Sequence, residues 1–509
     1  MPSQSRWPRG RAAKAQSRRL RTGFIRGAGA ALAVALLVPF SSIAAPPPLS
    51  IPISSEQSPN GAAADAGSFL SNLKRSNFLL GDMFGLRKTL SGYGIDLAVQ
   101  ETSEMLGNVT GGTRKGVQYD GLTQAILQLD TQRAFGLHGG LFNISALQIH
   151  GQNLSSDNLS TIQTASGIEA NRATRLWELW YDQKFLAEDR LDIKVGQQSV
   201  DQEFIASNNA AYFVNTMFGW PALPSYDMPG GGPAYPLSAL GVRFRYRPID
   251  SVNLLVGVFN GSPASNNSGD SQQQNASGTS FPLGGGRLII AELQYAYPSL
   301  GSMVYPGESA PLAHTYRLGA WYDTEGFDDQ RYDVNGLSLA NPASNGVPAK
   351  HRGDFSLYAV ADQMLWRNPD DPNNTLNVFG RIMGAPQNDR NFIRFSMNAG
   401  LVYHEPFRNR ADDTFGVGMG YVHVSSAVSG QDSDAINFAM QADPNSFNLV
   451  RHSETYVEVT YQYQLRPWWQ LQPDVQYVFM PGGGVVDPQD PTQRIRNELV
   501  LGLRTNILF

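Results

Sequence analysis

The chain ends on the stretch Leu499-Val500-Leu501-Gly502-Leu503-Arg504-Thr505-Asn506-Ile507-Leu508-Phe509. Every second side chain from Leu499 to Phe509 is apolar or threonine, whereas the positions between them include Arg504 and Asn506. Because successive side chains of a strand point to opposite faces, this spacing predicts a β-strand with one apolar face and one mixed face. One face suits lipid and the other suits water. A strand of a soluble β-sandwich would alternate in the same way, so the rest of the chain must decide.

The start of the chain predicts export from the cytoplasm. Residues 1–26 contain eight Lys or Arg and no acidic residue, and an apolar run follows from Gly27 to Phe40. This order is typical of a secretory signal peptide, which we assign to residues 1–44 with cleavage after Ala44. The apolar run of about 14 residues is short for a membrane span, so a helical anchor is the weaker interpretation. For an exported protein, a final strand that ends on Phe is common among bacterial outer-membrane barrels.

Composition narrows the class of protein further. Beyond the signal peptide no apolar run approaches 18 residues, and the chain is 41% hydrophobic with a mean hydropathy of -0.28. A helical membrane protein is therefore not expected, whereas a membrane barrel needs apolar residues only at every second strand position. The absence of cysteine excludes disulfides, Cys-liganded metals and thiol nucleophiles. Removing the eight positive charges of the signal peptide from the net charge of -5 leaves about -13, so we expect no nucleic-acid partner.

The remaining chain is predicted to form one all-β domain preceded by two short segments. Residues 45–67 are rich in Pro, Ser and Ala and are predicted to be a disordered lead-in. Residues 68–92 carry apolar side chains at helical spacing and are predicted to be a periplasmic amphipathic helical segment. Residues 93–509 alternate with a period of two, which predicts a transmembrane antiparallel β-barrel. About 16 strand segments begin near residues 93, 122, 139, 174, 190, 238, 251, 287, 313, 354, 374, 391, 413, 454, 469 and 495.

Short and long connections alternate between these segments, as an up-and-down barrel requires. Tight turns are expected at Arg247–Asp250, Leu186–Asp189 and Leu465–Pro467 on the periplasmic side. Long polar extracellular loops are expected at Gly261–Gly278, Gly326–Gly353 and Ser426–Ser453.

The connection at about residues 205–236 has a different character. It combines aromatic residues with many Pro and Gly, and it includes Trp220, Tyr226, Asp227 and Tyr235. Such a stiff, aromatic segment is predicted to pack inside the barrel as a constriction. Aromatic faces would contact the C–H faces of a pyranose, while polar side chains would bind its hydroxyls. The alternative is a loop packed outside the barrel, at a subunit contact or over the mouth.

Arginine is frequent on the predicted lumen side of the strands. Arg243, Arg245 and Arg247 alternate along one strand, and Arg381 and Arg394 lie on two others. The acidic side chains predicted to face the lumen are Glu178, Asp182, Asp192, Glu292 and Glu458. Opposing rows of charge create a transverse field that favours polar, neutral solutes, and the planar guanidinium holds several donors in one plane. The alternative is that these arginines only brace the acidic wall and the loops.

No catalytic or metal site is predicted. The seven histidines show no spacing that pairs them with a serine nucleophile or with further metal ligands. The stretch Gly416-x-Gly418-x-Gly420 lies in a predicted strand with no helix after it, so it is interpreted as a smooth lumen surface and not as a phosphate loop. We expect no enzyme activity, no cofactor and no metal.

Several motifs, in order, resemble the carbohydrate-selective porin family, the OprB-type glucose porins. Leu79-Leu80-Gly81-Asp82-Met83-Phe84-Gly85-Leu86-Arg87 is similar to the first family motif, in which Trp usually stands where this chain has Met83. The most specific resemblance runs from Glu454 to Gly482. Further similar stretches run from Val195 to Phe204, from Tyr235 to Gly241 and from Arg381 to Tyr403. The resemblance covers about residues 77–509. It implies a 16-stranded outer-membrane barrel that passes monosaccharides and small polyols by diffusion, with an arginine-bearing eyelet and a periplasmic N-terminal segment.

The leading hypothesis is therefore a sugar-selective porin in the outer membrane of a Gram-negative bacterium, with Arg243, Arg245, Arg247, Trp220, Tyr226, Asp227, Tyr235, Arg381 and Arg394 as candidate constriction residues. Its expected partners are small sugars or polyols and outer-membrane lipid. An anion or phosphate porin that uses the same arginines is one alternative, and a barrel adhesin or receptor is another. The sequence leaves a monomer and a trimer equally open.

Overall fold

The structure is a computed structural model that describes residues 77–509 apart from 265–268, 299–310 and 445. The predicted signal peptide (1–44) and lead-in (45–67) lie outside the described residues, as does the first part of the predicted helical segment 68–92. The described part of that segment ends in helix α2, Leu86–Gly92.

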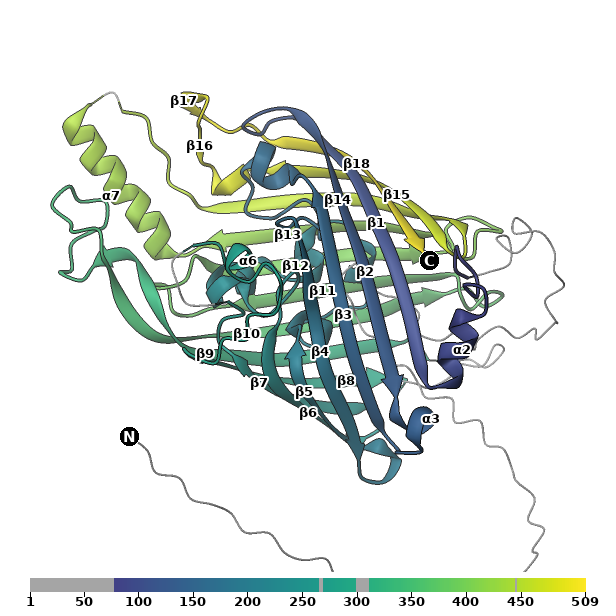
Figure 1. The fold of residues 1–509 in the computed structure, drawn as a ribbon. Coiled ribbons are helices and arrows are strands. Elements are labelled where there is room, and N and C mark those ends of the chain that lie inside the picture. The colour runs from purple at the N-terminus through teal and green to yellow at the C-terminus, as the bar shows by residue number, and fades with distance from the viewer. Residues whose placement is uncertain (1–76, 265–268, 299–310, 445) are drawn as a thin grey trace, which may run out of the picture. The chain divides into compact units, whose positions relative to one another are not determined.

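Sixteen antiparallel strands form a closed barrel within the described part of the chain (Figure 1). The order around the barrel is β1-β18-β15-β14-β13-β12-β11-β10-β9-β8-β7-β6-β5-β4-β3-β2, so the first strand pairs with the last. The barrel strands are β1 (Ile95–Thr110), β2 (Gly116–Asp130), β3 (Gly140–Gly151), β4 (Ala173–Phe185), β5 (Leu191–Gln198), β6 (Ala239–Ile249), β7 (Val252–Asn260), β8 (Arg287–Tyr297), β9 (His314–Asp333), β10 (Pro348–Arg367), β11 (Thr375–Gly384), β12 (Ile393–His404), β13 (Thr414–Val424), β14 (Ser453–Arg466), β15 (Trp469–Phe479) and β18 (Glu498–Leu508). This confirms the predicted all-β antiparallel barrel of about 16 strands.

The other described elements lie in the connections. A separate hairpin pairs β16 (Val486–Asp487) with β17 (Asp490–Arg494). The helices after α2 are α3 (Thr131–Phe135), α4 (Thr216–Gly219), α5 (Ala222–Asp227), α6 (Ser271–Gln274) and α7 (Ser426–Ala442). Shorter helical turns are η1 (Ser155–Leu159), η2 (Ala187–Asp189), η3 (Val200–Gln202), η4 (Ala210–Tyr212), η5 (Pro229–Gly231) and η6 (Pro481–Gly483). Among the described residues, no helix has both the length and the apolar character that crossing a membrane requires.

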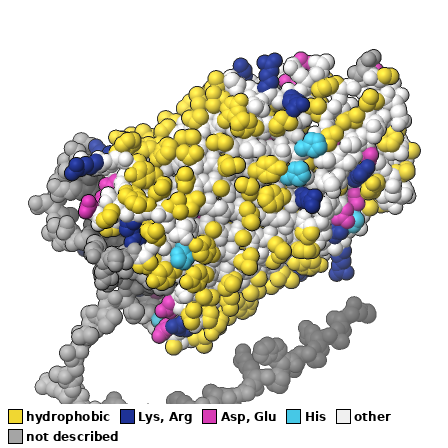
Figure 2. Space-filling model, turned by 180° about the vertical axis from the view of Figure 1, so that it is seen from behind, with side chains coloured by type: hydrophobic (Ala, Val, Ile, Leu, Met, Phe, Trp, Pro, Cys, Tyr) yellow, Lys and Arg dark blue, Asp and Glu magenta, His cyan; other side chains and the backbone are white. Residues whose placement is uncertain are grey.

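The outer face of the barrel is apolar because the strands alternate. In β8 the exposed positions include Ile289, Leu293 and Tyr295, whereas Glu292 between them is buried inside. Figure 2 shows apolar side chains gathered over the outer surface, with most charged side chains towards its two ends. An apolar belt of this kind is what a lipid bilayer requires of a barrel.

The terminal strand β18 has the predicted apolar outer face and mixed inner face. Leu501 and Leu503 are exposed on the outside, while Val500 and Arg504 are buried inside. The alternation is broken in β3 and β4 for a local reason, because their register shifts between Ser145 and Ala146. This bulge gives β4 an extra residue and moves its side chains from one face to the other.

The barrel has two different ends. At the short-turn end, two residues separate β6 from β7 and two separate β14 from β15. Helix α2 and the C-terminus lie at this end (Figure 1), where Arg87 donates to the backbone oxygens of Leu97 and Phe509. The connections at the opposite, long-loop end include residues 152–172 and 199–238.

Two predicted long loops are partly regular in structure. Within Gly326–Gly353, β9 continues to Asp333 and β10 begins at Pro348, so the strands extend well beyond the expected loop boundary. Within Ser426–Ser453, the chain forms helix α7, because the Ser425 hydroxyl caps its first turn by accepting from Val428 N–H. An ion pair between Arg331 of β9 and Asp434 of α7 then holds the helix on the β9 extension. Both stretches were expected from the sequence as long polar loops; the first is shorter than expected, and the second contains a helix.

Candidate functional site

Two long connections fold into the barrel and contact each other there. We call residues 152–172, between β3 and β4, the first inward segment, and residues 199–238, between β5 and β6, the second inward segment. Gly167 N–H donates to the oxygen of Val214 at 2.9 Å, and Thr216 N–H donates to the oxygen of Thr164 at 3.1 Å. The interior of the barrel is therefore occupied by backbone from both segments, and they must shape any passage through it.

Aromatic packing attaches the second inward segment to the far wall. The rings of Phe213 and Phe218 stack with centroids 4.3 Å apart, and Phe218 meets Tyr456 of β14 edge-on at 5.4 Å. Phe379 of β11 packs against both phenylalanines. All four side chains are at most 1% exposed. Aromatic groups that bury this much surface contribute strongly to the free energy of docking.

The three glycines of β13 make room for these rings. A Cβ atom at Gly418 would lie 2.6 Å from the Phe218 ring, and one at Gly416 would lie 3.0 Å from the Phe213 ring. At Gly420 the corresponding distance to the Tyr456 ring is 2.2 Å. Gly416-x-Gly418-x-Gly420, which was interpreted from the sequence as a smooth lumen surface, is thus the surface against which the second inward segment packs. Glycine is needed there because any side chain would occupy the space of the aromatic rings.

Carboxylates of the wall bind the backbone of the inward segments. The Glu458 carboxylate of β14 accepts from Val214 N–H at 2.6 Å and from Asn215 N–H at 3.0 Å. Asp362 of β10 accepts from Asn209 N–H at 3.1 Å. Further bonds of this kind join Ile162 and Gln163 to Glu454, Ile205 to Glu292, and Ser199 to Glu178. These hydrogen bonds hold the backbone of both segments against the wall at several points.

Arg381 is brought to the second inward segment but does not face open space. Its guanidinium donates to the backbone oxygens of Ile205 at 2.9 Å, Gly219 at 3.0 Å and Phe218 at 3.0 Å. The side chain is 1% exposed. This arginine braces the second inward segment, which is the alternative that the sequence left open for these arginines.

The ladder on β6 points inward as predicted, because Phe244 and Tyr246 between its members are exposed on the outside. Arg243 forms ion pairs with Asp192 and, at 2.8 Å, with Glu203. Arg245 pairs with the same Asp192 at 2.6 Å and is 26% exposed on its side chain. Arg247 lies at the short-turn end and donates to the backbone oxygen of Glu188 at 2.6 Å.

These groups form a compact charged wall, made by the short-turn half of β4, β5 and β6 together with Glu203 of the second inward segment. Lys194 of β5 pairs with Glu203 and lies 4.4 Å from the centre of the Trp180 ring. Asp182 of β4 lies 3.9 Å from Arg243. We define the charged wall as Asp182, Asp192, Lys194, Glu203, Arg243 and Arg245. It contains three acids and three bases.

Two of the predicted aromatic residues, Trp220 and Tyr235, lie inside the inward segments and not on an open passage. Trp220 and Tyr235 line the same small cavity between the inward segments, together with Asp201 and Asn215. Its free volume of about 20 Å³ is room for roughly one water molecule, not for a sugar. Trp220 donates from its ring nitrogen to the oxygen of Gly231, and the Tyr235 hydroxyl donates to the oxygen of Ile168.

Tyr226 and Asp227 lie where the second inward segment meets β12. Tyr226 is 44% exposed, and its ring stacks on Phe392 at 5.0 Å. The Asp227 carboxylate accepts from the N–H groups of Phe392 and Ile393 at 2.9 and 3.0 Å. Burial raises the pKa of Asp227 well above its ordinary value, and these two donors oppose the effect. Arg394 is not brought to the other candidates, because it is exposed in the register shift that follows Ile393.

The residues missed by sequence reasoning are in the first inward segment and in β4. Arg175, the third residue of β4, is 1% exposed, and only its Nη2 has a hydrogen-bond partner among the described residues, the oxygen of Asn171 at 3.4 Å. Its Nε and Nη1 are unpartnered there, and its charge lies close to Tyr235 and Asp270. The bulge in β3 and β4 hid the direction of this side chain from the alternation pattern.

The family model described as carbohydrate-selective porin, OprB family, matches residues 114–509. This chain belongs to the OprB family. The porin is 26% identical over 466 residues to Porin B of Pseudomonas aeruginosa, covering 88% of this chain and 94% of that protein. It is 23% identical over 430 residues to the putative porin QuiX of Acinetobacter baylyi, covering 80% and 89% of the two chains. The high-pH structure of Pseudomonas putida OprB matches with a TM-score of 0.72 and 25% identity, covering 86% of this porin and 99% of that chain.

The comparisons settle the class of the molecule. The porin is an outer-membrane channel of a Gram-negative bacterium that passes carbohydrates. The family resemblance and the predicted location are confirmed, and neither the anion-porin alternative nor the adhesin alternative gains support.

Proposed function

We propose that this porin passes monosaccharides and small polyols by diffusion, and that the two inward segments set the size limit. The observation that carries the proposal is the attachment of the second inward segment across the barrel, from β5 and β6 to Glu458 on β14. A 16-stranded barrel is wide enough to enclose an open aqueous channel. Backbone that is bound across the bore narrows this channel. Such a narrowing discriminates by solute size.

The charged wall supports a neutral substrate over an anion. Its three bases are matched by three acids, and Arg243 is 2% exposed between them. A wall with equal numbers of acids and bases produces a transverse electric field but has no net charge. It therefore does not raise the local concentration of anions. A sugar hydroxyl both donates and accepts, so it exchanges hydrogen bonds with both signs of charge.

Arg175 is the proposed sugar donor on the long-loop side of the inward segments. Its Nε and Nη1 have no partner among the described residues although the side chain is 1% exposed, so a hydroxyl oxygen that reaches them would satisfy a buried charge. Arg245 is the proposed donor on the short-turn side, since it keeps partial exposure beside Asp192. Arg381, Trp220 and Tyr235 would act by holding the inward segments in position.

Liposome swelling with the full-length mature porin tests the size limit. We expect pentoses and hexoses to enter several times faster than disaccharides of the same osmolarity. In planar bilayers with a KCl gradient we expect a reversal potential close to zero. Equal rates for hexoses and disaccharides would contradict the size limit, and a strongly anion-selective reversal potential would contradict the neutral substrate.

A further inference from the structure

A row of uncharged polar side chains crosses four neighbouring strands on the inner face, in the short-turn half of the barrel. Cross-strand partners in the ladder are Gln464 and Gln470, then Gln470 and Asn506, then Asn506 and Thr102. Directly paired positions of adjacent strands share one face. We define the amide row as Gln462, Gln464, Gln470, Asn506 and Thr102.

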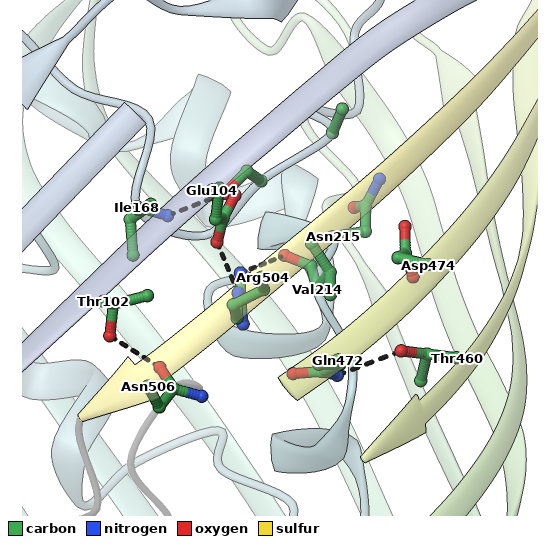
Figure 3. A network of polar contacts seen from close by, with 12 residues as sticks. Thr102, Glu104, Ile168, Val214, Asn215, Thr460, Gln472, Asp474, Arg504 and Asn506 are labelled. Carbon is green, nitrogen blue, oxygen red and sulfur yellow. Dashed lines mark hydrogen bonds and ion pairs between the residues drawn. The ribbon is translucent and has the colours of Figure 1, made fainter. Parts of the chain in front are cut away.

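The inner orientation of the row follows from its neighbours. Arg504 and Glu104 stand two residues from Asn506 and Thr102 on the same strands, and they form a buried ion pair. Arg504 also donates to the oxygen of Val214, which belongs to the second inward segment. Figure 3 shows this pair beside the bond between Thr102 and Asn506. Because side chains at alternate positions share a face, the amide row lines the bore.

The members of the row form a chain of hydrogen bonds. The Thr102 hydroxyl donates to Asn506 Oδ1 at 2.7 Å, and Asn506 Nδ2 donates to Gln470 Oε1 at 3.0 Å. Gln470 Nε2 donates to Gln462 and to Gln464, each at 3.3 Å. Gln470 Nε2 and Gln464 Nε2 each donate twice, so both of their hydrogens are used. Each amide oxygen has two lone pairs and Asn506 Nδ2 has a second hydrogen, so the oxygens and the asparagine nitrogen keep capacity for further partners.

The row is uncharged, and its amide residues are accessible, whereas Thr102 is 1% exposed. Its four amide residues are neither fully buried nor fully exposed, whereas the ion pair of Arg504 and Glu104 beside them is closed off, with side chains 1% and 0% exposed. Strands β2 and β3 separate the row from the charged wall on β4, β5 and β6. The short-turn half of the bore therefore has two different polar surfaces, one ionic and one amide.

Tyr212 of the second inward segment contacts the amide row through Gln462. Its backbone oxygen accepts from Gln462 Nε2 at 3.3 Å and from Gln472 Nε2 at 2.9 Å. Its partly exposed ring meets His404 edge-on, with centroids 4.8 Å apart. An aromatic ring beside amides is the combination that binds a pyranose, because the ring contacts C–H groups while the amides bind hydroxyls.

We propose that the amide row and Tyr212 form a second contact site for neutral polyhydroxylated solutes, on the short-turn side of the inward segments. The proposal rests on the sugar-conducting function proposed above and adds a further site at which the sugar binds weakly, besides Arg175 and Arg245. Conduction through a selective pore needs sites that bind weakly and in series, so that a solute leaves one for the next. Amides without net charge supply weak binding of this kind.

The first test is the double variant Gln470→Met with Asn506→Leu in the full-length porin, reconstituted in planar bilayers with glucose as the probe. Both substitutions keep the approximate side-chain size and remove the amide groups. We expect the dissociation constant for glucose blockade of the current to rise by about threefold to tenfold, as loss of one or two ordinary hydrogen bonds predicts. The matched control is Gln363→Met at the same end of the barrel, where Gln363 contacts the exposed Tyr316 on the outer face, and we expect it to leave blockade unchanged.

The second test is Gln470→Glu, which keeps the length of the side chain and adds one charge. If Gln470 lines the passage, the reversal potential in a KCl gradient shifts towards cation selectivity. An unchanged reversal potential, or unchanged glucose blockade in a folded double variant, overturns the amide site. These outcomes are distinct from failure of the proposed function, in which the unmodified porin itself shows neither glucose blockade nor glucose-driven swelling.

Discussion

Two buried arginines of the inner wall differ in what their guanidinium groups contact. Arg381 donates to the backbone oxygens of Ile205, Phe218 and Gly219, so its hydrogen-bonding capacity is largely used within the fold. Arg175 is equally buried, but two of its three nitrogens have no partner among the described residues. A buried charge without partners is costly unless a ligand or water satisfies it. This difference makes Arg175 the arginine to test.

Arg175→Met is predicted to weaken glucose binding and to leave the fold intact. Hydrogen bonds to charged groups contribute about 1.5–3 kcal/mol, which corresponds to at least tenfold in affinity. We therefore expect the dissociation constant for glucose blockade to rise about tenfold in planar bilayers. The control is Arg408→Met, an exposed arginine in the turn between β12 and β13.

The opposite result is equally clear. If Arg175 serves only the packing of β4, methionine removes an unsatisfied charge, and the thermal stability stays equal or rises while glucose blockade is unchanged. That outcome would exclude Arg175 as a sugar donor.

At the level of elements, the aromatic rings of the second inward segment pack against the glycines of strand β13 with complementary shape. Glycine at 416, 418 and 420 leaves space that Phe213, Phe218 and Tyr456 fill. Close-packed interiors respond to a single added carbon, so this seat is sensitive to substitution. The attachment by Glu458 and Arg381 adds polar bonds at both ends of the aromatic contact.

Gly418→Ala is predicted to displace the second inward segment. The added Cβ atom would lie 2.6 Å from the Phe218 ring, and overpacking of this kind costs about 1–3 kcal/mol. We expect a larger single-channel conductance and faster entry of disaccharides in liposome swelling. The control is Gly380→Ala on β11, where no atom lies within 4 Å of the added Cβ. Unchanged conductance in Gly418→Ala would mean that the segment does not limit the passage.

The attachment of helix α7 is predicted to depend on pH. A hydrogen bond from Arg331 holds the pKa of Asp434 below its ordinary value. A lowered pKa in the folded state gives a stabilisation that is complete above the unfolded value near 3.9 and is lost as pH falls through the folded value. The protection factors of the α7 amides in hydrogen exchange should therefore be unchanged down to pH 5 and fall only below about pH 4. Arg331→Met should lower these protection factors above pH 4 and have little further effect below it, and a fall in the unmodified porin between pH 6 and pH 5 would contradict the role of Asp434.

The sequence could predict the strands because their signal is local. The predicted starts lie within three residues of the observed ones for 14 of the 16 strands, and β2 and β10 begin six residues earlier. The inward direction of Arg243 and Arg245 followed from the same alternation. Helix α7 was missed because its polar sequence carries no apolar stripe. The first inward segment was missed because its partners, such as Glu454 for Ile162, lie almost 300 residues away in the chain.

At the level of the whole molecule, the bore combines inward segments that are held at several points with a charged wall in which acids and bases are equal in number. The inward segments are bound by carboxylates and by Arg381, while the bases of the charged wall are bound by acids of the same wall. The ionic groups of the charged wall thus satisfy one another, whereas Glu458 and Arg381 bind backbone groups. The charge balance of the short-turn half then determines which solutes gain from entering it, and changing one charge should change the class of solute.

Asp182→Asn is predicted to convert the porin towards anion selectivity with little effect on sugar entry. Asp182 is the acid of the charged wall that is held least tightly, since it lies 3.9 Å from Arg243 and its Oδ1 has no partner among the described residues. Its neutralisation leaves three bases against two acids, so chloride should be favoured over potassium in the reversal potential, while glucose swelling rates stay within about twofold. Asp328→Asn is the control, because Asp328 pairs with Lys350 on the exposed β9–β10 hairpin, far from the charged wall in the barrel order. A reversal potential that does not change in Asp182→Asn would mean that the charged wall lies outside the ion path.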